Sequence, residues 1–265
     1  MNASKALRLV SLLPKSPVEF YDRVMTVVEV TKERGRSASN ATPLVTSTEA
    51  LSVALDVSHR EIAEILGEVE LGQIERTVSE GITAQERTGP FHAGHNGDFA
   101  LARSIYVICR LRSPNAVLET GVAYGVTSAF ALQALAVNQK GALFSIDLPP
   151  LGKEADQHVG SVVPQKLRER WHLYRGTANR VLPKVLSSIG QLDLFVHDSL
   201  HTCRNMTFEF SKVWPCLRPR AVLIADDVGL NDAFHDFAAE VKPSFAAVMK
   251  EENKDAQFGI MVKPA

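Results

Sequence analysis

Val117-Leu118-Glu119-Thr120-Gly121-Val122-Ala123-Tyr124-Gly125-Val126-Thr127-Ser128 lies near the middle of this 265-residue chain, and Phe144-Ser145-Ile146-Asp147 follows it. The order is a short apolar run, a turn with two glycines, a helical pattern and a second apolar run that ends in Asp. This order predicts one βαβ unit, with two parallel strands joined by a helix.

The turn between the first strand and the helix predicts a crevice for a nucleoside. Gly121 and Gly125 let the backbone turn sharply and approach a ligand closely. The N-terminus of the following helix offers unpaired N–H groups and a partial positive charge. Asp147 ends the second strand, where a carboxylate can accept hydrogen bonds from two ribose hydroxyls. An ordinary strand-to-helix turn of an α/β protein is the alternative explanation.

The charges around this turn favour S-adenosylmethionine over a dinucleotide. Glu119 stands two residues before the first glycine and would repel a pyrophosphate, and no Lys or Arg lies between residues 117 and 137. Ala123 occupies the position of the middle glycine in the dinucleotide pattern. S-adenosylmethionine has an ammonium that an acidic group can hold and a carboxylate that the helix end can hold.

Three downstream segments make the pattern more specific: Arg175-Gly176-Thr177-Ala178, Asp198-Ser199-Leu200-His201-Thr202 and Ala221-Val222-Leu223-Ile224-Ala225-Asp226-Asp227. From about Asn96 to its C-terminus, the chain resembles the class I S-adenosylmethionine-dependent methyltransferases. Within them it is similar to small-molecule O-methyltransferases of the cephalosporin-hydroxylase-like and sugar O-methyltransferase group. One departure is Arg220-Ala221, where such proteins usually carry Gly-Gly at the turn into a strand.

The resemblance implies how the cofactor is held. The acidic residue and the glycine turn would hold the methionine part, Asp147 the ribose, and Thr177 and Ala178 would flank the adenine. The residues expected to bind the cofactor are Glu119, Gly121, Tyr124, Gly125, Ser128, Asp147, Gly176, Thr177, Ala178 and Asp198.

The acidic ends of two neighbouring strands predict a metal site. Asp198, Asp226 and Asp227 offer hard oxygen ligands that suit Mg²⁺, and a bound ion would lower the pKa of an acceptor hydroxyl and orient it. In the resembling enzymes, an acidic residue of the Asp-Ser-x-His segment and the acidic pair coordinate such an ion. The alternative is structural, with Asp226 or Asp227 capping the next helix and Asp198 ordering its loop.

We expect His201 to act as the general base, because the ordinary pKa of histidine lies near 6.5 and Asp198 could orient it. The alternative is a histidine that satisfies loop backbone groups. Histidine pairs at residues 197/201 and 92/95 could also suggest zinc, but without thiolates this metal is disfavoured. His197 is expected to be structural, and His95 can line the cleft.

The rest of the chain predicts the architecture. Strands are expected at 116–120, 142–147, 172–175, 192–198, 221–226, 245–249 and 258–262, mostly alternating with helices. This makes an α/β fold with a doubly wound, mostly parallel, seven-stranded Rossmann-like sheet, whose terminal strand must be antiparallel. Residues 1–90 show helical patterns and no strand, so we expect a helical appendage followed by a cofactor-binding domain at 91–265. The loop at 148–163 is a candidate lid.

Composition limits the partners. Apolar residues make up 45% of the chain, and 29 Lys and Arg balance 30 Asp and Glu, which gives no long-range attraction to nucleic acid or anionic membrane. Three cysteines without CxxC spacing fit a reducing cytoplasm. The N-terminal helices can pair protomers into a homodimer, cover the cofactor cleft or do both. The alternative is that they simply cover one face of the sheet. The rival functions are a nicotinamide-dependent oxidoreductase and a catalytically silent methyltransferase-like assembly module.

Overall fold

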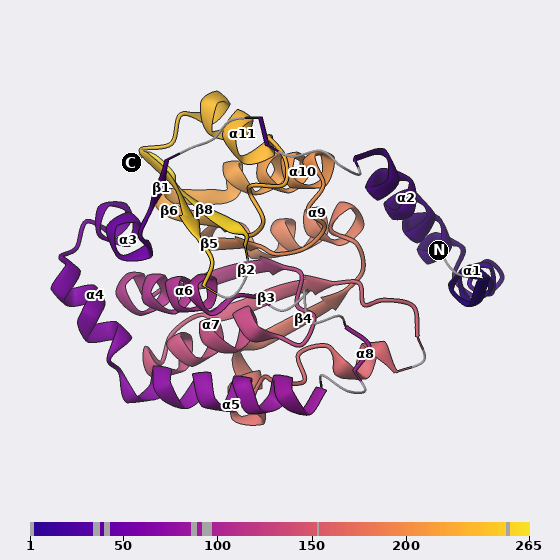
Figure 1. Ribbon diagram of the computed structural model, residues 1–265, viewed down its shortest axis with the longest axis horizontal. Coiled ribbons are helices and arrows are strands. Elements are labelled where there is room, and N and C mark those ends of the chain that lie inside the picture. Colours follow the sequence, from indigo (N-terminus) through magenta and orange to yellow (C-terminus); the bar gives the residue numbers. More distant parts are fainter. Residues whose placement is uncertain are drawn as a thin grey trace.

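A single eight-stranded sheet forms the centre of the protein, in the order β1-β7-β8-β6-β5-β2-β3-β4 (Figure 1). The computed structural model describes residues 3–33, 38–39, 43–85, 89–91, 97–152, 154–252 and 255–265. The strands are β1 (Leu44–Val45), β2 (Ala116–Thr120), β3 (Ala142–Asp147), β4 (Trp171–Arg175), β5 (Leu192–His197), β6 (Leu217–Ala225), β7 (Phe245–Lys250) and β8 (Gln257–Val262). Only β8 runs antiparallel to its neighbours, β6 and β7. The predicted doubly wound sheet and its antiparallel strand are confirmed.

The eighth strand corrects the prediction that residues 1–90 contain no strand. Leu44 and Val45 pair in parallel with Val248 and Met249 at the free edge of β7. A run of two residues is too short to show the alternation that marks a strand in sequence. The pairing depends instead on an edge supplied by a segment about 200 residues further along.

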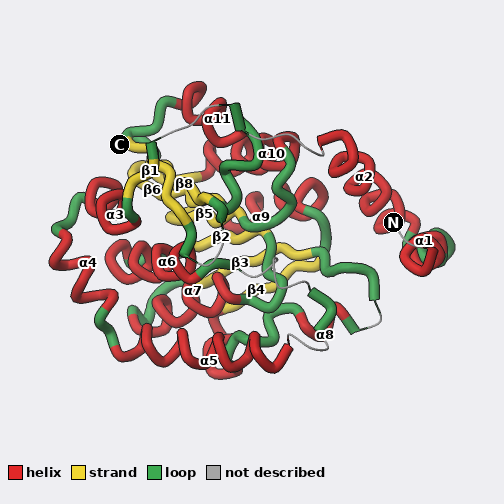
Figure 2. Tube along the Cα trace, in the orientation of Figure 1, coloured by secondary structure: helices red, strands yellow, loops and turns green. Residues whose placement is uncertain are grey.

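Helices cover both faces of the sheet (Figure 2). One face is covered by α6 (Phe99–Arg112), α7 (Val126–Val137) and, over β7 and β8, α3 (Ser47–Leu55), whereas α4 (His59–Leu66) and α5 (Val69–Gln85) pack outside α6 and α7. The opposite face is covered by α9 (Ala178–Ile189), α10 (Cys203–Val213) and α11 (Ala233–Val241). Adjacent residues of β2 point into different cores, Val117 toward α6 and α7 and Leu118 toward α9 and α10.

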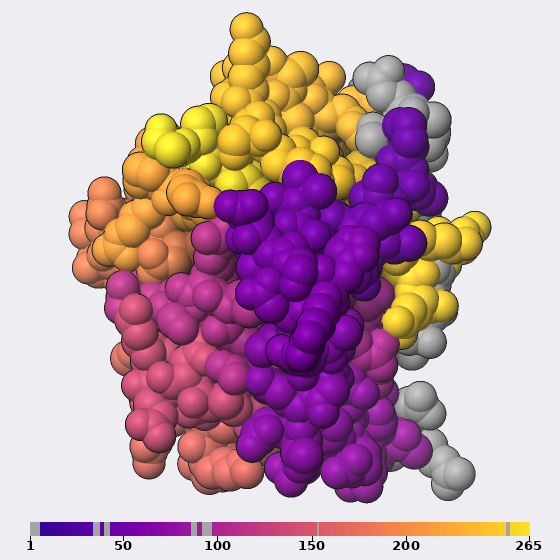
Figure 3. Space-filling model, turned by 90° about the vertical axis from the view of Figure 1, so that its left-hand side faces the viewer, coloured from indigo at the N-terminus to yellow at the C-terminus, as the bar shows by residue number. Residues whose placement is uncertain are grey.

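Helices α3 to α5 form a continuous surface on the side of the molecule seen in Figure 3. A capping box begins α4, where Ser58 and Glu61 exchange side-chain and backbone hydrogen bonds. Asp98 caps α6. Two further helices, α1 (Ala3–Val10) and α2 (Pro17–Glu33), lie apart from these, at the other end of the molecule (Figure 1).

The remaining elements are short: α8 (Ala155–His158) and two 3-10 helices, Gln165–Arg170 and Trp214–Cys216. Arg220 adopts φ of +63°, so a left-handed residue forms the turn where the related proteins place glycine. None of the helices in the described ranges has the length and apolar character needed to cross a membrane.

Candidate functional site

The carboxyl ends of five strands meet at one edge of the sheet. Backbone hydrogen bonds connect them beyond the ladder: Asp198 N–H to Thr120 O at 2.8 Å and Asp226 N–H to His197 O at 2.8 Å. Gly176 N–H likewise donates to Asp147 O at 2.9 Å. The structure therefore brings together the strand ends that the sequence marks with glycine or acidic residues.

The glycine turn after β2 requires residues without side chains. Gly121 has φ of +83°, and a Cβ there would lie 1.8 Å from the carbonyl oxygen of Asp198. Gly125 has φ of +93°, and a Cβ there would lie 2.9 Å from the Cα of Gly160. The turn is consequently packed between the loop after β5 and the loop after β3, and any larger residue would displace its backbone.

Asp147 presents an unsatisfied carboxylate oxygen beside this turn. Its Oδ1 accepts a hydrogen bond from the Val122 N–H at 3.1 Å, whereas its buried Oδ2 has no hydrogen-bond partner. Burial raises the pKa of Asp147 to about 6, against the opposing effect of the Val122 and Ala123 amides. A buried acceptor without a partner is costly, so the geometry fits a ligand that brings its own hydroxyl donors, such as a ribose.

Glu119 is fully buried, and hydroxyl groups of the protein itself bind its carboxylate. Its carboxylate accepts hydrogen bonds from Thr127 at 2.7 Å, Ser128 at 2.6 Å and Ser145 at 2.7 Å. Burial raises the pKa of Glu119, and the three hydroxyls oppose that rise. The bonds connect the end of β2 to the first turn of α7 and to β3. Direct contact of Glu119 or Ser128 with a cofactor stays a prediction.

The other predicted cofactor residues lie in two places, Tyr124 in the glycine turn and three residues at the end of β4. Tyr124 is buried, and its ring packs edge-on against Phe91 with centroids 4.9 Å apart. Gly176, by contrast, lies at the end of β4 next to Asp147, followed by Thr177 as the N-cap of α9 and Ala178 as its first residue. Contact of these four residues with a cofactor stays a prediction. His92, His95 and Asn96 lie outside the described residues.

The loop at 148–163 packs onto the glycine turn. Gly160 N–H donates to Ala123 O at 2.9 Å, and Val162 N–H donates to Tyr124 O at 3.1 Å. Val162 and Val163 are both buried. In this structure the second half of the proposed lid therefore forms a wall of the turn.

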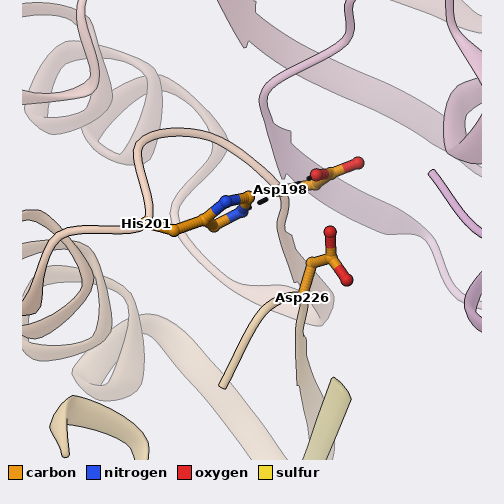
Figure 4. Close-up of side chains that lie close together, drawn as sticks. All are labelled: Asp198, His201 and Asp226. Carbon is orange, nitrogen blue, oxygen red and sulfur yellow. Dashed lines mark ion pairs between the residues drawn. The ribbon is translucent and has the colours of Figure 1, made fainter. Parts of the chain in front are cut away.

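The acidic ends of β5 and β6 surround a histidine (Figure 4). His201 Nδ1 lies 3.0 Å from Asp227 Oδ2, and His201 Nε2 lies 3.7 Å from Asp198 Oδ1. Asp226 is 1% exposed, and its Oδ1 has no hydrogen-bond partner. Burial by itself lowers the pKa of His201, but the hydrogen bond to Asp227 and the charges of Asp226, Asp227 and Glu209 outweigh it and raise the pKa.

Two groups of side chains within the described residues have ligand atoms close enough to hold a metal ion. One is Asp198, His201 and Asp226, and the other is Asp226, Asp227 and Glu251. Each group has its ligand atoms within 4.8 Å of one another. Glu251, which follows β7, was missed by the sequence analysis because it stands outside any recognisable motif. The structure brings the predicted trio of Asp198, Asp226 and Asp227 to one place but pairs Asp227 with His201.

A buried polar pair supports this loop from behind. Glu209 of α10 accepts a hydrogen bond from Ser199 at 2.7 Å, and its other oxygen lies 2.7 Å from His197 Nδ1. Burial alone would raise the pKa of Glu209. The charge of His197 and the hydrogen bonds from His197, Thr120 and Ser199 outweigh burial, so the pKa of Glu209 is lowered. His197 is thus structural in this geometry, as expected. Glu209 was not predicted, since a lone Glu in an amphipathic helix gives no signal.

Helix α2 lies along the same edge. Glu19 pairs with Arg175 at 2.7 Å at the end of β4, and Asp22 pairs with Arg180 at 2.6 Å in α9. At the other end of α2, Glu29 accepts from the hydroxyl of Thr202, the N-cap of α10. Helix α2 therefore borders the site, and its predicted role as a cover of the cofactor cleft stays a prediction.

Comparisons with known proteins relate part of the sequence, and the fold, to methyltransferases. Residues 118–228 match the model of a family described as a methyltransferase domain. No curated protein sequence matches the chain.

Several solved structures are similar to it. An O-methyltransferase from Bacillus cereus, in complex with SAH, has a TM-score of 0.56 and 15% identity over 72% of this chain and 90% of that one. The O-methyltransferase TomG from Streptomyces achromogenes, involved in tomaymycin synthesis and in complex with SAM, has a TM-score of 0.55 and 15% identity over 92% and 99%. An SAH-bound methyltransferase from Podospora anserina has a TM-score of 0.52 and 14% identity over 71% and 88%. At 14–15% sequence identity, these similarities show a shared fold alone.

Proposed function

We propose, on the premise that this chain carries a methyltransferase domain with the class I fold, that it is an S-adenosylmethionine-dependent O-methyltransferase. Its acceptor would be a hydroxylated small molecule, such as a natural product or a sugar-like compound. The observation that carries the proposal is the partnerless, buried Oδ2 of Asp147 beside the Gly121–Gly125 turn. The antiparallel β8 and the acidic β5 and β6 ends support a methyltransferase over a nicotinamide-dependent oxidoreductase.

When bound, S-adenosylmethionine supplies a methyl group on a positively charged sulfur. The protein's part in an in-line displacement is to position the two partners and exclude competing geometries. Asp147 would accept hydrogen bonds from the ribose hydroxyls, and the N–H groups at the start of α7 would face the carboxylate of the methionine part. Gly176, Thr177 and Ala178 would flank the adenine, and Glu119 would keep the turn in shape.

The acceptor hydroxyl must lose its proton during the transfer. His201 is the residue that we propose for this step, because Asp227 engages Nδ1 and leaves Nε2 for the acceptor. We also propose that a divalent cation such as Mg²⁺ assists at the acidic strand ends, where Asp198, Asp226 and Asp227 gather. A cation there would lower the pKa of the acceptor hydroxyl and orient it.

Calorimetry of the purified chain tests the cofactor assignment. We expect binding of S-adenosylhomocysteine and no binding of NAD, and the opposite result would overturn the proposal. A second measurement follows transfer of a labelled methyl group to a panel of hydroxylated acceptors. S-adenosylhomocysteine binding without transfer to any acceptor, and with no effect of Asp198→Ala or His201→Ala, would favour the silent assembly module.

A homodimer is a further part of the proposal. Large apolar side chains on α1 and α2 are exposed, among them Leu7, Val18 and Tyr21. Such a surface is typical of a helix that pairs with another chain. Light scattering after size-exclusion chromatography measures the mass directly, and a monomer at micromolar concentration would contradict this part alone.

A further inference from the structure

We infer that His201 is a metal ligand through Nε2, in a site formed with Asp198 and Asp226, and that Asp227 is an outer carboxylate that orients the imidazole. The inference rests on the proposed function, refines its divalent-cation part and replaces the expected Asp198, Asp226 and Asp227 set. It also replaces the general-base role of His201, because a coordinated Nε2 has no electron pair for a proton. Activation of the acceptor hydroxyl would then come from the bound ion, which lowers the pKa of that hydroxyl. A site of this composition favours a first-row transition ion, such as Mn²⁺, over Mg²⁺. Three features of the structure support it.

The first feature is the orientation of the imidazole. Nδ1 of His201 is 3.0 Å from Asp227 Oδ2, so the N–H of the ring points to that carboxylate. Nε2 is then the nitrogen with the free electron pair, and it is buried without a hydrogen-bond partner. Metal-binding histidines almost always donate their other ring N–H to a carboxylate or carbonyl in this way.

The second feature is what Nε2 faces. Figure 4 shows the side chains of Asp198, His201 and Asp226 close together, with the His201 ring directed toward Asp198 and with Asp226 beside them at the end of β6. Asp226 is 1% exposed, and its Oδ1 has no hydrogen-bond partner. Two atoms that each lie about 2.1 Å from one ion can be at most about 4.2 Å apart. The ligand atoms here are within 4.8 Å, so small side-chain rotations close the site.

The third feature is the rigidity of the loop that carries His201. Asn231 donates to the carbonyl of His201 at 3.3 Å, and Asn205 donates to that of Leu200 at 3.0 Å. The hydroxyl of Thr202 caps α10 one residue later. A backbone fixed on both sides of His201 holds the imidazole in place before any ion arrives, which favours binding.

The chemistry of the donors decides the class of ion. One imidazole and two carboxylates suit Mn²⁺, Fe²⁺, Co²⁺ and Zn²⁺, whereas all-oxygen sites suit Mg²⁺ and Ca²⁺. The neighbouring group of Asp226, Asp227 and Glu251 has only oxygens and is the competing location. Because Asp226 belongs to both groups, the decisive difference is whether a nitrogen coordinates the ion.

Pulsed electron paramagnetic resonance on the chelator-stripped, Mn²⁺-loaded full chain measures that difference. Coordinated imidazole produces a characteristic ¹⁴N modulation, which we expect in the wild type and expect to vanish in His201→Ala. The control is His59→Ala, since His59 is exposed at the start of α4 and should leave the signal unchanged. The wild-type spectrum is informative even if His201→Ala fails to fold.

Calorimetric titrations with Mn²⁺ and Mg²⁺ complete the test, without cofactor or acceptor. We expect Mn²⁺ to bind more tightly than Mg²⁺. Asp227→Ala should lower the affinity for Mn²⁺ by about 10- to 100-fold. Asp227→Asn, which keeps an acceptor for the ring N–H, should lower that affinity less. Mn²⁺ binding without the ¹⁴N signal and abolished by Glu251→Gln would move the ion to the all-oxygen group and overturn the inference. No Mn²⁺ binding at millimolar concentration would also overturn it, while S-adenosylhomocysteine binding would still support the proposed function.

Discussion

The carboxylate of Glu33, the last residue of α2, accepts a 2.6 Å hydrogen bond from the backbone N–H of Cys203, the first residue of α10. A helix N-terminus has N–H groups without intrahelical partners, and Glu33 satisfies two of them here, because its other oxygen accepts from the Arg204 N–H at 3.3 Å. At the opposite end of α2, Glu19 and Asp22 pair with Arg175 and Arg180. Polar contacts at both ends thus hold α2 against the carboxyl edge of the sheet.

The double variant Glu19→Gln/Asp22→Asn should loosen the first half of α2. Hydrogen exchange of residues 17–28 should become faster, because three ion pairs are lost, those to Arg175 and Arg180 and the Glu19–Arg23 pair within α2, while the fold of the sheet is unchanged. The thermal midpoint should change little, since the pairs to Arg175 and Arg180 each have one exposed partner and a pair four residues apart in a helix contributes only about 0.3–0.5 kcal/mol. Glu64→Gln, which breaks an exposed pair with Arg60 in α4, is the matched control. Unchanged exchange in α2 would show that apolar contacts hold it instead.

Glu119→Ala should be strongly destabilising. The substitution removes the acceptor shared by the buried hydroxyls of Thr127, Ser128 and Ser145, and we expect a loss of about 2–4 kcal/mol in the free energy of unfolding. Glu119→Gln should cost less, because burial already favours the neutral form. Urea unfolding measures both. Ser128→Ala, which removes one donor, should cost about 1 kcal/mol.

The same variants separate the two roles of Glu119. If Glu119 contacts the ammonium of the cofactor directly, Glu119→Gln would weaken S-adenosylhomocysteine binding with little change in stability. The hydrogen bonds in the structure favour the other outcome, in which stability falls and the affinity of the protein that remains folded is nearly unchanged.

The parts of the fold that follow local rules could be predicted from sequence. The strands ending at Thr120 and at Asp147 have the predicted bounds, because apolar runs and glycines determine them locally. The convergence of Asp147, Asp198 and Asp226 could also be predicted, since parallel strands end at the same edge.

What could not be predicted depends on contacts between distant segments. Leu44 and Val45 become a strand only because β7 offers its edge. Glu251 joins the acidic cluster because the turn after β7 returns to the end of β6, and nothing in its own neighbourhood indicates that. The packing of Tyr124 against Phe91, 33 residues earlier, is likewise a long-range contact that the sequence of the turn does not indicate.

Asp147→Ala should weaken S-adenosylhomocysteine binding. Hydrogen bonds to a charged acceptor contribute about 1.5–3 kcal/mol, so their loss corresponds to about 10- to 100-fold in the dissociation constant. The control is Asp193→Asn in β5. Asp193 accepts a hydrogen bond from the Asn115 N–H at the amino end of the strands, the edge of the sheet opposite Asp147. Equal affinities of wild type and Asp147→Ala in calorimetry would remove Asp147 from the cofactor site.

The raised pKa of Asp147 predicts opposite effects of pH on stability and on binding. Since its pKa is 3.8 ordinarily and about 6 in the folded protein, the folded state holds the proton more tightly, and this stabilisation is present below pH 4 and lost as the pH rises through 6. The shift corresponds to about 3 kcal/mol at most. Asp147→Asn cannot ionise, so the stability of the wild type relative to this variant should fall between pH 4 and 7 in urea titrations.

Binding should follow the ionised form instead. The charged carboxylate is the better acceptor for two ribose hydroxyls, so the affinity for S-adenosylhomocysteine should rise through pH 6 in the wild type. In Asp147→Asn, this part of the pH dependence should disappear. Parallel pH profiles of affinity in the two proteins would mean that the raised pKa of Asp147 has no connection with the cofactor.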